Sequence, residues 1–313
     1  MARPALIKHW VYPSGQWEKC PDHSLAYTGS KIIQFPHGVA ITDVIMRSGF
    51  IRGSVSMADV SNSAAAFVFG YKVHDRSYFS SGLGGYTGAY DIQQFIPSKQ
   101  AWIGLEVIGE KNSLESKKAY DLKLEIIGGQ RVRTYVDEVL VIQKDFDAPI
   151  IGQLGLYAWG DKEVLFKDIH VVPATPKLFV IISFSDEYDA FFKDVIQPLE
   201  KSLKRGKTFE QDVYVYRVKD VKKPGQIYDD IIKGIIEADA VIAEVTPCNE
   251  NIFYELGYSH AINKPTVLLK HRDRKLPFDI YNYRCIDYDE NTSADNIQRQ
   301  LKDYLINAIE TSK

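Results

Sequence analysis

Residues 240–263, AVIAEVTPCNENIFYELGYSHAIN, decide the fold of the second half of the chain. The short apolar run 240–245 predicts a strand. Thr246 and Pro247 end this run, and a helical pattern then extends from 249 to 262. A strand that leads through a polar loop into a helix is the repeating unit of an open parallel sheet. Such sheets bind ligands at the carboxyl ends of their strands.

The same alternation of strand and helix continues on both sides of this stretch. The expected strands are residues 178–182, 213–218, 240–245, 266–269 and 283–288, and the expected helices are residues 186–204, 226–238, 249–262 and 293–309. Alternation of this kind predicts an α/β domain with a doubly wound, five-stranded parallel sheet of the flavodoxin-like type. In the second helix, Ile227, Ile231 and Ile235 are expected to face the sheet.

The first half of the chain, residues 8–172, reads as short strands and turns with no convincing helix. Apolar and polar residues alternate with the period of a strand in 101–107 and 120–126. Further strands are expected at residues 131–136, 139–143, 153–158 and 163–172, with tight turns at Gly128-Gly129, Asp137-Glu138 and Trp159-Gly160-Asp161. Short strands at this spacing predict an all-β sandwich built from a run of hairpins.

The length of the chain, 313 residues, favours two domains over a single core. The hydrophobic period changes around residues 174–177, where Pro173 and Pro176 predict a short, stiff linker. We therefore expect the sandwich in residues 1–173 and the α/β domain in residues 178–313.

The composition argues against several classes of protein. With 45% apolar and 25% charged residues the chain is an ordinary globular one, and its net charge of -3 gives no electrostatic reason to expect duplex nucleic acid as a partner. No run reaches the ~20 apolar residues of a membrane span, and the N-terminus shows no signal-peptide pattern, so we expect a cytoplasmic protein without a membrane partner. The three cysteines lie far apart, which predicts neither a metal site nor a disulfide framework.

Two loops after the first two strands provide candidate substrate-binding residues. The first holds Ser183, Phe184, Ser185 and Asp186, whose hydroxyls and backbone amides suit a phosphate or a ribose hydroxyl. Alternatively, Ser185 or Asp186 caps the helix, and the residues alone favour this interpretation. The second loop holds Arg217, whose guanidinium matches a phosphate oxygen, although a cation after a strand is also common on an ordinary surface.

The third strand provides two more candidates for substrate binding, Glu244 and Thr246. Glu244 alternates with apolar neighbours, which places it at the mouth of the expected site. Asp239 precedes the strand and belongs at its opposite end, so we expect a structural role for it.

The helix that follows carries the strongest catalytic candidate, Glu255. Asn251, Glu255 and either Tyr258 or Ser259 share one face, because residues three or four apart on a helix are neighbours. Tyr254 is a further candidate for substrate contact, and Gly257 is expected to face the sheet and permit close packing of the helix. A solvated glutamate is the common alternative for Glu255, and spacing alone leaves the two interpretations open.

A family resemblance is carried by ADAVIAEVTPCNENIFYELGYSHAINKPTVLLK and by LPFDIYNYRCIDYD, and most strongly by NENIFYELGYSHA. In these motifs the region 177–289 resembles the Toll/interleukin-1 receptor (TIR)-like and nucleoside 2-deoxyribosyltransferase-like group of bacterial proteins. The resemblance implies that Glu255 is the catalytic carboxylate and that residues 183–186 line the nucleotide site. The third strand of this group usually ends in an aspartate, whereas this chain has Glu244, and the departure leaves the substrate open.

The resemblance implies cleavage of an N-glycosidic bond, often that of NAD, which is then a substrate and not a cofactor. Such domains often serve bacterial anti-phage defence and become active on self-assembly, which implies a homo-oligomer. Nicotinamide leaves NAD as a neutral molecule without a proton donor, so one carboxylate can stabilise the oxocarbenium-like ribose or attack it, and no metal is needed. A neutral purine or pyrimidine would need an acid as well, for which Glu244, Tyr254 and Tyr258 are candidates.

Three functions follow from these observations. The leading hypothesis is a TIR-like NAD glycohydrolase that is regulated by its N-terminal sandwich. The second is a nucleotide-binding signalling module that does not turn over its ligand. The third is a nucleoside hydrolase or deoxyribosyltransferase, which the departure at Glu244 keeps open.

The end of the sandwich, GQLGLYAWGDKEVLFKDIHVV, resembles the closing strands of a concanavalin-like jelly roll of the laminin-G type. Residues 78–90 are rich in glycine and tyrosine, and aromatic rings on a jelly roll can stack on sugars. The same segment is also suited to contact the second domain or another subunit. We favour that interpretation, because a fold alone does not give a function.

Overall fold

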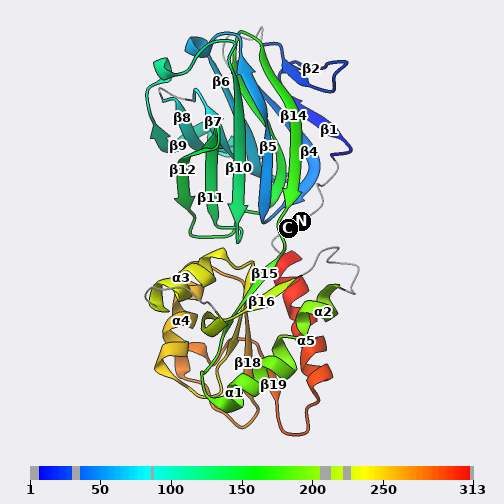
Figure 1. Ribbon diagram of the computed structural model, residues 1–313, viewed down its shortest axis with the longest axis vertical. Helices are drawn as coiled ribbons and strands as arrows, with labels where there is room; N and C mark the ends of the chain where they lie inside the picture. Colours follow the sequence, from blue (N-terminus) through cyan, green and yellow to red (C-terminus); the bar gives the residue numbers. More distant parts are fainter. Residues whose placement is uncertain (1–6, 30–35, 86–87, 205–212, 221–226, 311–313) are drawn as a thin grey trace. The chain divides into compact units, whose positions relative to one another are not determined.

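The computed structural model describes residues 7–29, 36–85, 88–204, 213–220 and 227–310 (Figure 1). The chain forms two compact units that divide between Ala174 and Thr175, and the unit that contains the C-terminal residues also includes the short segments 127–130 and 146–149. Residues 174–176 of the expected linker lie at this division, between strands β14 (Val164–Pro173) and β15 (Lys177–Ile181), and Lys177 already belongs to β15.

The N-terminal unit is a sandwich of two seven-stranded sheets, which confirms the predicted all-β jelly roll. The first sheet has the order β1 (Trp10–Ser14), β4 (His37–Met46), β13 (Gly152–Gly160), β6 (Ser63–Tyr71), β7 (Tyr78–Leu83), β8 (Tyr90–Ile96) and β9 (Ala101–Ile108). The second sheet has the order β12 (Val139–Asp145), β11 (Arg131–Val136), β10 (Ala119–Ile127), β5 (Gly49–Met57), β14, β3 (Leu25–Tyr27) and β2 (Trp17–Lys19). Helical residues in the described part of this unit form only the short 3-10 turns η1 (Val60–Asn62), η2 (Pro97–Lys99) and η3 (Lys111–Ser113).

Strand alternation decides which side chains fill the space between the two sheets. In β10, Tyr120, Leu122, Leu124 and Ile126 are buried and alternate with more exposed residues, as expected for a strand with one face on a core. The hydroxyl groups of Ser81 and Thr134 lie 2.7 Å apart, and they belong to β7 and β11 of opposite sheets. They therefore mark the inner face of β7.

The pairing of β13 and β14 corrects the expected run of hairpins. The two strands flank the predicted turn at 159–161, yet β13 pairs with β4 and β6, and β14 pairs with β3 and β5. The turn therefore leads from one sheet to the other. A tight turn brings two strand ends close together, but it does not determine whether the strands bond to each other or to different neighbours.

The C-terminal unit is the predicted doubly wound domain with a five-stranded parallel sheet. Its sheet has the order β16 (Tyr214–Tyr216), β15, β17 (Ala240–Glu244), β18 (Thr266–His271) and β19 (Cys285–Tyr288). Its helices are α1 (Asp186–Phe191), the π-helical turn η4 (Phe192–Ile196), α2 (Leu199–Lys204), α3 (Ile227–Glu237), α4 (Glu250–Ala261) and α5 (Ala294–Glu310), with the 3-10 turns η5 (Val218–Asp220) and η6 (Phe278–Ile280). Across the described ranges, no helix is long and apolar enough to span a membrane.

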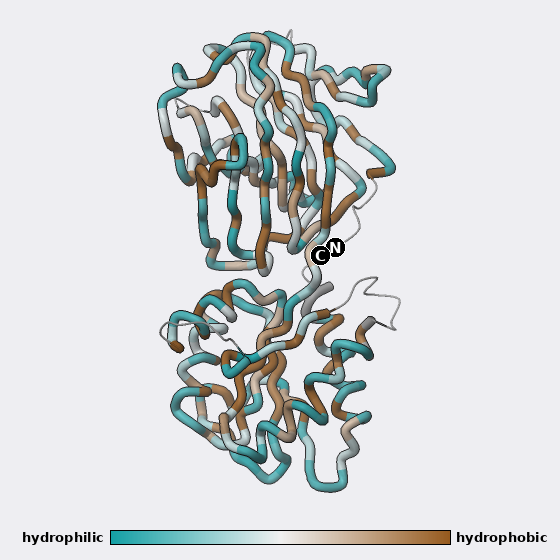
Figure 2. Tube along the Cα trace, viewed as in Figure 1, coloured by the Kyte–Doolittle hydropathy of each residue, from teal (hydrophilic) through white to brown (hydrophobic). Residues whose placement is uncertain are grey.

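The sheet is covered on both faces, and each face has its own core. On one face the sheet packs with α1, η4, α2 and α5, through residues that include Phe192, Leu199 and Leu301. On the other face it packs with α3 and α4, through residues that include Ile235 and Leu256. Figure 2 shows the apolar strands in the middle of this unit.

Three sequence expectations for this unit are corrected. The single helix expected at 186–204 is interrupted, because Pro198 has no amide hydrogen and the preceding turn is π-helical, with Gln197 N donating to Phe192 O at 2.8 Å. The second strand, expected at 213–218, is confined to β16. Ile227 at the start of α3 is 64% exposed and does not face the sheet, while Gln226 lies outside the described residues.

Glycine positions give a further correction. Gly257 was expected to allow close packing of α4, but it is exposed and a methyl group at its Cα would meet nothing within 4 Å. Gly234 in α3 has this role instead, because a Cβ there would lie 2.5 Å from the ring of Phe179. Phe179 is 1% exposed and has no room to move away.

We predict opposite effects of alanine at these two glycines. Gly234→Ala should lower the free energy of unfolding by about 1–3 kcal/mol, since it forces a buried ring to shift. Gly257→Ala should raise it by about 0.5–1 kcal/mol, since alanine loses less backbone entropy in a helix. Urea unfolding of the full-length variants measures both, and a destabilised Gly257→Ala would contradict the packing described here.

Candidate active site

Glu255 lies in the middle of α4, beside the face of the helix that packs on the sheet. The helix begins after β17, where Asn249 caps it by accepting a hydrogen bond from Asn251 N at 2.8 Å. Ile252, Leu256 and Ser259 are the buried residues of α4, and they recur at helical spacing. Glu255 directly precedes Leu256 in the chain and is half-buried at the border of this face.

The carboxyl group of Glu255 is desolvated without compensation. Burial raises its pKa from 4.5 to about 7, and desolvation is the only cause of the shift. Within the described ranges, this carboxyl group forms no hydrogen bond or ion pair with the protein. A half-buried carboxylate of this kind can interact with a cationic centre or with the hydroxyl groups of a ligand.

Glu244 has a different environment, which corrects its expected place at the mouth of the site. It is fully buried, and its Oε1 accepts hydrogen bonds from Thr246 N at 3.2 Å, from Tyr288 OH at 2.9 Å and from the Thr246 hydroxyl. Thr246 Oγ1 also accepts a bond from His271 N at 2.8 Å. Burial raises the pKa of Glu244 to about 7, although the bonds from Thr246 and Tyr288 oppose the shift.

Glu244 in β17 and Glu255 in α4 lie on opposite faces of the sheet. In β17, Ala240 and Ile242 belong to the core under α1 and α5, whereas Val241 and Ala243 belong to the core under α3 and α4. Strand alternation therefore directs Glu244 to the α1 side, near Tyr188 and Tyr288, while α4 carries Glu255 on the other side. Glu244 and Glu255 therefore lie on different faces of the sheet.

The loop after β15 places its polar groups at the carboxyl end of that strand. Ser185 is the N-cap residue of α1, and its carbonyl accepts a bond from Asp189 N at 2.9 Å, but its hydroxyl makes no capping bond. Ser183 is half-buried, and Phe184 and Asp186 are exposed. Ser185 therefore occupies the expected capping position. A role of these four residues in substrate binding remains a prediction.

Arg217 does not have the exposed position expected of a phosphate ligand. Its side chain is 4% exposed and lies 4.3 Å over the ring of Phe192. Its guanidinium donates to Asp189 at 2.6 Å and to Asp220 at 3.3 Å. Because removing such a buried charge from its partners is costly, the structure gives Arg217 a role in holding α1 and η5 together.

The tyrosines and the asparagine of α4 are divided between its faces. Asn251 is exposed, as is Tyr254, whose hydroxyl lies 2.9 Å from that of Tyr228 in α3. Tyr258 is half-buried and packs against the core under α3 and α4. Asn251 and Tyr258 thus differ in exposure, so the face that they share with Glu255 by helical spacing remains a prediction, whereas Tyr254 has a partner in α3.

Asp239 confirms its predicted structural role at the other end of β17. Its carboxylate accepts a hydrogen bond from Lys177 N at 2.8 Å, which joins the starts of β15 and β17. Two residues around Glu244, Tyr188 and Tyr288, were not among the predicted site residues. Tyr288 ends a predicted strand, so its position at the carboxyl edge was available as a signal, but its bond to Glu244 was not.

Comparison with protein families supports the identification of this unit. Residues 182–308 match the family model described as nucleoside 2-deoxyribosyltransferase, so the match lies within the α/β unit. The C-terminal domain is therefore nucleoside deoxyribosyltransferase-like. A comparison with curated proteins returned no match.

Comparison with solved structures returns β-sandwich proteins. A carbohydrate-binding module, CBM66, from Bacillus subtilis is 17% identical with a TM-score of 0.44, over 52% of this chain and 94% of that chain. A protein of unknown function with a galectin-like fold from Bacillus subtilis is 12% identical with a TM-score of 0.40, over 56% and 100%. A β-glucanase from Bacillus licheniformis is 9% identical with a TM-score of 0.38, over 53% and 92%. The assignment of the sandwich rests on its own two sheets.

We predict that Glu255→Gln stabilises the C-terminal domain at pH 8 and has little effect at pH 5. The folded pKa of Glu255 exceeds the unfolded value, so the folded chain holds the extra proton between about pH 4.5 and 7, and stability falls as the pH rises through this window. The neutral amide avoids this loss. Allowing for solvent screening, we expect a Tm about 2–4 °C higher at pH 8.

Differential scanning calorimetry of both proteins at the two pH values measures this effect. Glu244 titrates in both proteins, so the comparison isolates Glu255. An equal difference in Tm at pH 5 and pH 8 would show that the amide acts through packing and not through desolvation.

Proposed function

We propose that the C-terminal domain cleaves the N-glycosidic bond of a nucleoside or nucleotide and that Glu255 is its catalytic carboxylate. The observation that carries the proposal is the desolvated carboxyl group of Glu255, which has no partner among the described residues. The match of residues 182–308 to the deoxyribosyltransferase family supports the reaction class.

The chemistry of such a bond suits a single buried carboxylate. As the base leaves, positive charge develops on the sugar ring, and a nearby carboxylate stabilises it. The carboxylate can also attack the anomeric carbon and form a covalent glycosyl-enzyme. Water then completes a hydrolysis, whereas a second base completes a transfer.

The leaving group distinguishes the two candidate substrates. A purine or pyrimidine leaves more readily when a group donates a proton to it, and Tyr258 is the candidate donor on the same side of α4 as Glu255. Nicotinamide leaves NAD without a proton. Glu244 lies on the opposite face of the sheet and is therefore not placed to donate a proton to a leaving base. NAD, which needs no such donor, remains a second candidate substrate. The TIR-like role in phage defence, which was expected together with NAD cleavage, remains a second candidate function.

We predict that Glu255→Gln and Glu255→Ala lower the rate of N-glycosidic cleavage by at least ~10²-fold, as expected for loss of a catalytic carboxylate. The full-length protein is incubated with deoxynucleosides, ribonucleosides and NAD, with and without an acceptor base, and products are separated by chromatography. Glu250→Gln, which changes an exposed acid in the first turn of the same helix, should keep the rate.

The product formed from each substrate supports a different function. Base exchange or base release supports the deoxyribosyltransferase or nucleoside hydrolase, and nicotinamide release supports the NAD glycohydrolase. An unchanged rate in Glu255→Gln contradicts the catalytic role. Tight binding of a nucleotide by calorimetry, with no product from any substrate, supports the non-catalytic signalling module instead.

We further predict that kcat/KM of the wild type rises with pH and levels off above an apparent pKa near 7. Only the ionised carboxylate stabilises cationic charge or acts as a nucleophile, and burial places the pKa of Glu255 at about 7. Initial rates between pH 5.5 and 8.5 at limiting substrate give the profile. A profile that is flat in this range, on a substrate without ionising groups, argues against Glu255 as the titrating group.

A further inference from the structure

The outer face of the first sheet in the sandwich carries a cluster of apolar and aromatic residues that is separate from the core between the sheets. Because Ser81 marks the inner face of β7, strand alternation places Tyr78 and Ser80 on the outer face. The cluster consists of Val39, Ile41, Ala64, Ala66, Val68, Tyr71, Tyr78 and Tyr157, with Phe95, Trp102 and Trp159 packed against it. We call this surface the aromatic face.

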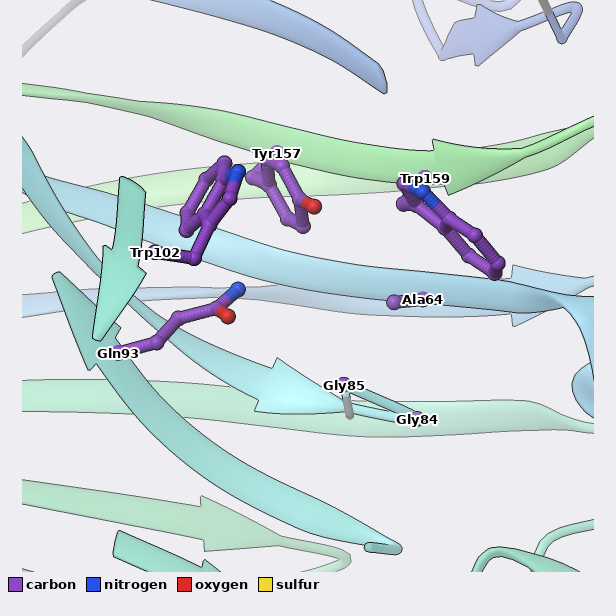
Figure 3. A pocket seen from close by; sticks show the side chains of 7 residues that line it. All are labelled: Ala64, Gly84, Gly85, Gln93, Trp102, Tyr157 and Trp159. Carbon is purple, nitrogen blue, oxygen red and sulfur yellow. The ribbon is translucent and has the colours of Figure 1, made fainter. Parts of the chain in front are cut away.

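A first cavity of about 210 Å³ opens on the aromatic face (Figure 3). It is lined by Ala64, Gly84, Gly85, Gln93, Trp102, Tyr157 and Trp159. The rings of Trp102 and Tyr157 lie next to each other in Figure 3, with centroids 4.9 Å apart, and the side chain of Gln93 extends toward them. None of the described residues that line this cavity is charged.

A second cavity of about 200 Å³ lies on the same face. Its lining includes His37, Tyr71, Arg76, Tyr78 and Phe95. The ring of Trp102, from the first cavity, has its centroid 4.7 Å from Phe95, 5.6 Å from Tyr78 and 6.3 Å from His37. The two cavities are therefore neighbours, with Trp102 between their linings.

Each cavity has a buried polar side chain in its lining. The hydroxyl of Tyr78, which is 3% exposed and lines the second cavity, has no hydrogen-bond partner. Gln93, which is 4% exposed, lines the first cavity. Buried polar groups in proteins are normally paired, so the unpaired hydroxyl of Tyr78 calls for an explanation.

Two further unpaired atoms lie beside them. Ser80 Oγ and Asp91 Oδ2 are buried and have no hydrogen-bond partner. Ser80 pairs with Gln93 across the strands, and Asp91 lies two positions before Gln93 on β8, so both side chains belong to the aromatic face. A Cβ at Gly85 would lie 2.2 Å from Asp91 Oδ2, so the glycine leaves room for this carboxyl group at the edge of the first cavity.

We propose that the aromatic face binds a neutral carbohydrate chain, with one pyranose ring in each cavity. The C–H faces of a pyranose can pack on the rings of Trp102 and Tyr157, and its hydroxyl groups can both donate to and accept from the unpaired polar groups. Each cavity is smaller than the ~300–1,000 Å³ of a site for a drug-sized ligand, which suits a single ring.

The site binds carbohydrate and does not hydrolyse it. Glycosidases generally use two carboxyl groups that flank the scissile bond. Among the described residues that line the two cavities none has a carboxyl group, and Asp91 supplies a single one at the edge of the first cavity. The binding site is also independent of the N-glycosidic activity proposed for Glu255.

The test is calorimetric titration of the full-length protein with glucose, cellobiose, laminaribiose, maltose and di-N-acetylchitobiose. We expect at least one disaccharide to bind about tenfold more tightly than glucose. Gln93→Leu and Tyr78→Phe should each weaken that binding about tenfold, and Trp102→Ala should abolish it. Gln94→Leu, on the opposite side of β8, and Glu255→Gln should leave it unchanged.

Thermal unfolding of the same variants separates binding from folding. Tyr78→Phe removes an unpaired buried hydroxyl, so its melting temperature should stay equal to or exceed that of the wild type, and Gln93→Leu should keep a cooperative unfolding transition. Failure of all four disaccharides to bind overturns the proposal. Binding that survives both substitutions, or binding of adenosine on this face in place of a disaccharide, overturns it as well.

Discussion

The parallel sheet of the C-terminal domain is buried on both faces, and this constraint determines where a functional group can lie. All residues of β17 are buried, and the side chains on its two faces enter separate cores. A polar side chain in the middle of such a strand would lose its water without finding a partner. The polar groups are therefore found at the carboxyl ends of the strands or on the covering helices, as Glu255 is.

The two glutamates near this edge show how a similar pKa can accompany different roles. Burial raises both values to about 7. Glu244 receives hydrogen bonds from Thr246 and Tyr288 at Oε1, which join the ends of β17 and β19, while its Oε2 is buried without a partner. Glu255 receives none from the described residues at either carboxyl oxygen, so the protein does not compensate its desolvation. A perturbed carboxyl group without a partner is the more plausible site of chemistry, because its interaction energy is still available to a substrate.

The sequence was sufficient for most properties that depend on neighbours along the chain, with the interruption of the helix at Pro198 as an exception. The strand, the loop and the helix of residues 240–263 follow from hydrophobic period and from the cap at Asn249. Properties that depend on distant partners were not predicted. The buried side chain of Arg217 forms an ion pair with Asp189, which is 28 positions away in the sequence. The buried side chain of Glu244 accepts a hydrogen bond from Tyr288, which is 44 positions away. Likewise, the exchange of roles between Gly257 and Gly234 depends on how closely each helix approaches the sheet.

In the sandwich, too, buried polar groups without a partner stand out against an apolar environment. Its first sheet has a second apolar cluster on the outer face, and such a cluster normally excludes polar atoms that lack a partner. Tyr78, Ser80 and Asp91 contribute such atoms nonetheless, all from β7 and β8. Uncompensated polar groups lower the stability of a folded chain, so their concentration in one place is better explained by ligand binding than by folding. In the sandwich, therefore, the proposed site is marked by polar groups that the fold buries without pairing. In the C-terminal domain the proposal rests instead on the half-buried carboxyl group of Glu255, because the unpaired buried atom Glu244 Oε2 lies on the other face of the sheet.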